Sequence, residues 1–105
     1  MKRLNRLVWF VALLGLSPPP QSVTSTMKGM AFSPARIEVT AGSTVTWRNA
    51  DNVAHTVTAR DGSFNSGNVA AGGSWQKTFS TPGTYSFYCQ PHPNMTGTVV
   101  VKPRG

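Results

Sequence analysis

Three side chains that bind soft metal ions lie within seven residues near the end of the chain. The segment Cys89-Gln90-Pro91-His92-Pro93-Asn94-Met95 offers a thiol, an imidazole and a thioether. His55 precedes Cys89 by 34 positions, and the chain has no other cysteine and no third histidine. Thiolate and thioether ligands favour copper(I), whereas imidazole also suits copper(II). A site that combines the four side chains is therefore suited to hold copper in both oxidation states.

Each of these residues also has an ordinary structural explanation when it is taken alone. A single cysteine is often a small buried hydrophobic residue, and a single methionine more often fills a core than binds a metal. Either histidine could be a structural residue with its hydrogen bonds satisfied. Because all four explanations would have to hold together, we favour the metal site. Two further residues, Met27 and Met30, are expected to pack in the first strand, although exposed thioethers there would bind copper(I).

Short segments with alternating polarity are expected to position these side chains. Such alternation, interrupted by Gly and Pro turns, is typical of strands. The predicted fold is an all-β Greek-key sandwich of about seven to eight short strands. Cys89 would end the strongest strand and His55 would begin another. The segment 61–73 is predicted to be a loop with room for a short helical turn. The predicted strands are 23–28, 36–40, 44–47, 55–58, 75–79, 84–89 and 98–101.

The first 17 residues are predicted to be a secretory signal peptide. A basic head with Lys2, Arg3 and Arg6 precedes the apolar run 7–16, which is too short to cross a bilayer as a helix. Cleavage is expected between residues 17 and 26, with a linker over 18–25 and one domain over 26–105. A buried helix and an uncleaved membrane tether are the alternatives. The protein is therefore expected to be periplasmic or otherwise extracytoplasmic.

Charge and cysteine content argue against nucleic-acid binding and against a disulfide framework. The chain has ten basic and three acidic residues, and removal of the signal peptide leaves seven basic against three acidic, a net charge of +4. The basic residues form no run, so nucleic-acid binding is not indicated. A mild positive field suffices to steer an acidic partner protein. One cysteine cannot form a disulfide framework within the chain.

Residues 26–102 resemble the cupredoxins, in particular the plastocyanins and amicyanins. The run from Gly83 to His92 is similar to the copper-binding strand and loop of plastocyanins, and the spacing C-x2-H-x2-M matches amicyanins. The segment 42–55 resembles the one that supplies the first histidine ligand. This resemblance implies that His55, Cys89 and His92 are equatorial ligands of one copper ion. It also implies that Met95 is the axial ligand.

The resemblance implies an electron carrier without a substrate. The predicted signal peptide implies that it is exported, and nothing in the sequence indicates an oligomer. His92 would expose its ring edge between Pro91 and Pro93, and redox partners would dock weakly there. Thr56 stands where the family often has an asparagine that bonds toward the cysteine loop, and a hydroxyl could serve the same purpose.

Four other functions remain as alternatives. A copper chaperone or buffer on the same fold is the main one, and the extra methionines give it some support. An enzyme such as a multicopper oxidase or nitrite reductase is disfavoured, because it would need further histidines. A structural zinc site usually takes more Cys or His ligands and no Met. The last alternative is an interaction domain without a metal.

Overall fold

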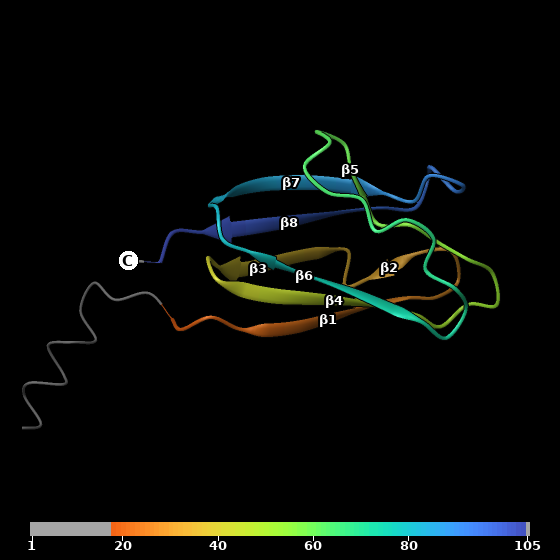
Figure 1. The fold of residues 1–105 in the computed structure, drawn as a ribbon, viewed down its shortest axis with the longest axis horizontal. Helices are drawn as coiled ribbons and strands as arrows, with labels where there is room; N and C mark the ends of the chain where they lie inside the picture. The colour runs from red at the N-terminus through yellow and green to blue at the C-terminus, as the bar shows by residue number, and fades with distance from the viewer. Residues whose placement is uncertain (1–17, 105) are drawn as a thin grey trace, which may run out of the picture.

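Eight strands form two four-stranded sheets in the computed structural model, which describes residues 18–104 (Figure 1). The strands are β1 (Ser22–Met27), β2 (Phe32–Ser33), β3 (Arg36–Thr40), β4 (Ser43–Asn49), β5 (Thr58–Ala59), β6 (Ser74–Phe79), β7 (Gly83–Tyr88) and β8 (Thr96–Lys102). One sheet has the order β2-β1-β4-β6, and the other has the order β3-β8-β7-β5. The described residues contain no helix, and the predicted all-β sandwich is confirmed.

Most predicted strand boundaries differ from the observed ones by one or two residues, so that β7 ends at Tyr88 and not at Cys89, and three differences affect the description of the fold. The first strand begins at Ser22, inside the expected linker, because β1 pairs in parallel with β4 from Ser22 onward. The two-residue strand β2 is too short to produce an alternating pattern and was not predicted. The predicted strand 55–58 is wrong for most of its length, since regular pairing with β7 begins only at Thr58.

The segment 61–73 forms no helical turn. It is held instead by two isolated bridges, one between His55 and Val69 and one between Thr58 and Asn65. These bridges also explain why residues 55–59 are buried without alternation. The loop covers one side of this segment, and β7 covers the other.

Aromatic side chains from both sheets fill the core around Trp47. The alternation of β4 directs Val45 and Trp47 inward, and neither side chain is exposed. The Trp47 ring stacks on Trp75 of β6 at 5.7 Å between centroids. The ring of Phe87, from the opposite sheet, forms a T-shaped contact with Trp47 at 5.4 Å between centroids. Because Phe87 lies two residues before Cys89, this contact joins the core to the end of β7.

Gly97 allows β8 to pass close to Phe87. A β-carbon at this position would overlap with Cζ of Phe87 and would lie 2.7 Å from the carbonyl oxygen of Ala35. Neither neighbour can move easily, because Phe87 is fully buried and the Ala35 oxygen accepts a hydrogen bond from Thr98. We expect Gly97→Ala to lower the free energy of unfolding by about 1–3 kcal/mol, the usual cost of overpacking.

Denaturant unfolding of the metal-free protein measures this loss. The control is Ser86→Ala at an exposed position on β7, which is expected to change stability by less than about 0.5 kcal/mol. A Gly97→Ala loss no larger than that of the control would contradict the close approach.

The connections that carry the predicted ligands meet at one end of the sandwich. Figure 1 places the β7–β8 loop and the β4–β5 connection at the end opposite the C-terminus. The predicted signal peptide over 1–17 lies outside the described residues. Within 18–104, no helix has the length and apolar character needed to span a membrane.

Candidate metal centre

Three donor atoms from distant parts of the sequence form a small triangle. The Nδ1 atoms of His55 and His92 lie 3.2 Å apart, and Sγ of Cys89 lies 3.6 Å from the first and 3.5 Å from the second. A triangle with these sides has a circumscribed radius of about 2.0 Å, close to the roughly 2.0–2.3 Å at which imidazole nitrogen and thiolate sulfur bind zinc. The three atoms can therefore contact one metal ion together.

A compact loop after β7 carries Cys89, His92 and Met95. The amide of His92 donates to the Cys89 carbonyl at 3.1 Å, and the amide of Met95 donates to the His92 carbonyl at 2.9 Å. The amide of Cys89 donates back to the Met95 carbonyl at 3.0 Å, which closes the loop. The side chains of Cys89 and Met95 are buried. The backbone alone thus holds the three predicted ligands of this segment together.

Asn49 and the 61–73 loop fix the position of His55. The backbone of His55 exchanges two hydrogen bonds with Val69, at 3.1 and 2.7 Å. The fully buried Asn49 donates from Nδ2 to the carbonyl oxygens of Val53 and Val69. Its side chain therefore holds both segments that flank the histidine. Asn49 was predicted only as part of the family-like segment 42–55, and the signal for its role was a polar residue at the end of a buried strand.

Thr56 connects the two halves of the site. Its amide donates toward Sγ of Cys89 at 3.3 Å, and its hydroxyl oxygen accepts a hydrogen bond from the amide of Gln90 at 2.9 Å. The same hydroxyl lies 2.9 Å from that of Thr58. A hydroxyl at this position thus reaches the cysteine loop.

Asp51 lies behind His55, on the side away from the triangle. Oδ2 of the carboxylate is 2.8 Å from Nε2 of His55. The hydrogen bond to His55 lowers the pKa of Asp51, and the amides of Met30 and Gly29 lower it further. The carboxylate is therefore ionised at neutral pH. Asp51 was not among the predicted site residues, because nothing local in the sequence indicates that its side chain reaches a histidine.

The two histidines differ in exposure. The side chain of His55 is fully buried, whereas His92 is partly exposed between the exposed residues Pro91 and Pro93. Because Nδ1 of His92 faces the triangle, the opposite edge of its ring lies on the outer side. Val53 is also exposed at this end of the sandwich, by 42%. The site thus combines a buried interior with one ring that reaches the surface.

The family model for copper-binding proteins of the plastocyanin/azurin family matches residues 20–102. This chain belongs to that family. The match covers the whole sandwich described above, together with all four predicted ligands. It confirms the resemblance stated from the sequence, and it identifies copper as the metal of this cupredoxin.

Two curated relatives illustrate the similarity. Amicyanin-alpha of Methylorubrum extorquens is 33% identical over 89 residues, which cover 80% of this chain and 75% of the relative. Plastocyanin of Scenedesmus fuscus is 33% identical over 86 residues, which cover 70% of this chain and 88% of the relative.

Solved structures agree on the fold. A purple cupredoxin from Nitrosopumilus maritimus superposes with a TM-score of 0.69 at 29% identity, covering 76% of this chain and 99% of that one. A copper-containing nitrite reductase from Thermus scotoductus also superposes, with a TM-score of 0.71 at 30% identity. This cupredoxin covers 82% of its own length in that match but only 23% of the reductase.

The donor set fits copper better than zinc. Cys89 supplies a soft thiolate and the two histidines supply borderline nitrogens, a combination that suits both oxidation states of copper. Among the His, Cys, Asp and Glu side chains of residues 18–104, those of His55, Cys89 and His92 form a group of three that is close enough to share a metal ion. Met95 is buried at the end of the same loop. Its assignment as the axial ligand rests on the family resemblance.

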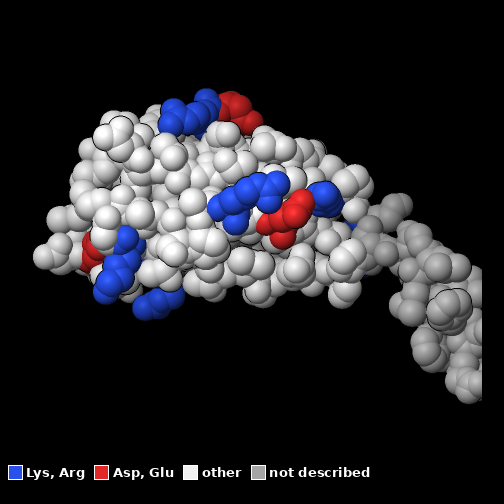
Figure 2. Space-filling view, turned by 180° about the vertical axis from the view of Figure 1, so that it is seen from behind, with Lys and Arg blue, Asp and Glu red and all other residues white. Residues whose placement is uncertain are grey.

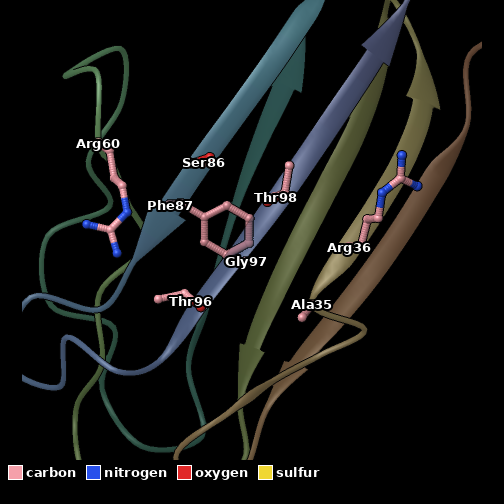
Figure 3. A pocket seen from close by; sticks show the side chains of 8 residues that line it. All are labelled: Ala35, Arg36, Arg60, Ser86, Phe87, Thr96, Gly97 and Thr98. Atoms are coloured by element: carbon pink, nitrogen blue, oxygen red, sulfur yellow. The ribbon is translucent and has the colours of Figure 1, made fainter.

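A surface hollow in the described part of the chain contains none of the predicted ligands. A hollow of about 440 Å³ lies on the outer face of β7 and β8, between Arg36 and Arg60 (Figure 3). None of the predicted ligands lines it. Figure 2 shows the basic side chains of one face in separate groups, each with an acidic side chain nearby, and not as one patch. This distribution agrees with the absence of a basic cluster in the sequence.

Proposed function

We propose that this protein carries single electrons between redox partners through one copper ion held by His55, Cys89, His92 and Met95. The buried triangle of two Nδ1 atoms and one Sγ atom is the observation that carries the proposal. When bound, copper supplies a centre that changes between +1 and +2 with the gain and loss of one electron. The residues around it serve to hold the donor atoms still and to keep water away.

The ligands are held by contacts that do not depend on a metal. The closed loop from Cys89 to Met95 and the Thr56 contacts fix the cysteine side of the site. Pro91 and Pro93 restrict the conformations of the same loop in the unfolded chain as well. A site that changes little between oxidation states loses little energy to rearrangement, which favours fast electron transfer.

Partner proteins are proposed to dock around the exposed edge of His92. Pro91, Pro93 and Val53 give this surface an apolar character. Weak redox encounters bury little area, below about 1,200 Å². The net positive charge would raise the rate of association with an acidic partner rather than the affinity. We also propose that residues 1–17 direct export, so that the carrier works as a monomer outside the cytoplasm, or tethered if the segment is retained.

A copper chaperone or buffer is the second candidate. Met30 supports it, because its side chain is 46% exposed and lies in a turn beyond β1. The expectation that Met30 packs in the first strand is therefore wrong. Met27 is fully buried in β1, as expected, and cannot offer a surface thioether. A carrier is favoured, because the triangle of donor atoms is preformed while the surface of residues 18–104 offers one thioether, that of Met30.

An absorption spectrum tests the proposal. Copper(II) is added to the purified protein, which is then reduced with ascorbate and reoxidised. We expect an intense blue band that disappears and returns, together with a reversible one-electron wave in voltammetry. A colourless protein that binds copper(I) tightly would support the chaperone, and a protein that binds no copper would refute the ligand assignment.

A further inference from the structure

The imidazole of His55 lies between the metal-binding triangle and a carboxylate. Its Nδ1 faces Cys89 and His92, and its Nε2 lies 2.8 Å from Oδ2 of Asp51. An ionised carboxylate can only accept hydrogen bonds. Nε2 must therefore carry the proton in the neutral ring, which leaves the lone pair of Nδ1 directed at the triangle.

The position of the Asp51 carboxylate is fixed independently of His55. The amides of Gly29 and Met30 donate to its two oxygens at 2.8 and 3.1 Å. These two residues form the tight turn between β1 and β2, with φ angles of 63° and 60°, and their amides converge on the carboxylate. The amide of Asp51 itself donates to Oδ1 of Asn49 at 2.9 Å. The carboxylate is thus held in place by contacts other than the one with the histidine.

The other two acidic residues of the chain have no such relation to the site. Glu38 is 45% exposed and pairs with Lys102 on β8. Asp61 accepts a hydrogen bond from the amide of Ser63 in its own exposed turn. The Asp51 side chain is only 14% exposed and touches a fully buried ring. Asp51 alone therefore places a negative charge behind a predicted ligand.

We propose that Asp51 is a positioning residue of the copper centre, which keeps His55 in the tautomer that presents Nδ1 and lowers the reduction potential of the site. This inference rests on the proposed function. A negative charge behind His55 stabilises the more positive copper(II) more strongly than copper(I). Removing the charge therefore weakens copper(II) binding relative to copper(I) and raises the potential. Loss of such an outer partner typically weakens metal binding by about 10- to 100-fold.

The test compares Asp51→Asn with Asp61→Asn and Glu38→Gln, each of which removes one negative charge. Asparagine keeps an oxygen that can accept from the turn amides. We expect Asp51→Asn to lower the ratio of copper(II) to copper(I) affinity by about tenfold, which corresponds to a rise of about 59 mV in voltammetry. The two control variants should shift the potential much less. A shift for Asp51→Asn no larger than that of the controls would overturn the proposal.

A measurement on the unaltered, metal-free protein covers the case in which Asp51→Asn does not fold. Nitrogen-15 NMR of the histidine side chains should find the proton of the neutral His55 ring on Nε2. A proton on Nδ1 would overturn the proposal. Because this readout needs no copper, it tests the role of Asp51 even if the spectrum described above refutes electron transfer.

Discussion

Replacing Cys89 with serine is expected to abolish the blue band and the reversible copper wave completely. Sγ of Cys89 lies 3.6 and 3.5 Å from the Nδ1 atoms of His55 and His92, and it accepts a hydrogen bond from the amide of Thr56. A serine hydroxyl is a harder donor that stays protonated at neutral pH, so it binds copper(I) poorly and cannot supply a thiolate. Absorption and voltammetry of the copper-loaded variant measure the effect.

The matched control for Cys89→Ser is Met30→Leu. Met30 carries an exposed sulfur outside the triangle, and its replacement is expected to leave the band and the wave unchanged. Persistence of the blue band in Cys89→Ser would contradict the ligand assignment. Loss of copper(I) binding in Met30→Leu, with Cys89→Ser still binding, would instead support a surface copper site and the chaperone function.

Trp47→Ala is expected to have the largest effect on stability, a loss of about 3–5 kcal/mol in the free energy of unfolding. The side chain is fully buried between the two sheets and contacts Trp75, Phe79 and Phe87. Its Nε1 has no hydrogen-bond partner, so the loss arises from packing and from the cavity that remains. Urea unfolding of the metal-free protein measures the change.

Trp47→Phe is the control for this prediction. Phenylalanine keeps an aromatic ring against Trp75 and removes the buried N–H that lacks a partner, so a clearly smaller loss is expected. A Trp47→Ala loss below about 1 kcal/mol would show that the core collapses around the vacancy. Phe87 packs on Trp47 and lies two residues before Cys89. The Trp47→Ala variant should therefore also broaden the blue band.

Local sequence patterns are sufficient to predict much of the fold and of the metal centre without any tertiary information. The alternation in residues 44–47 is sufficient to predict that Val45 and Trp47 are buried, because successive side chains of a strand point to opposite faces. The segment from Cys89 to Met95 keeps its donors close simply because all of them lie within seven consecutive residues. The ligand types, the strand that ends at the site and the family resemblance all follow from these short-range features.

Only the tertiary structure decided how the distant parts meet. His55 approaches Cys89 because a bridge to Val69 and the side chain of Asn49 hold it, and neither contact has a local signature. The contact between Asp51 and His55 also depends on the turn at Gly29 and Met30, more than 20 residues away. Alternation even mispredicted residues 55–58, which are buried from two sides. Long-range hydrogen bonds and burial arise only when separate segments pack together, and a sequence pattern cannot contain them.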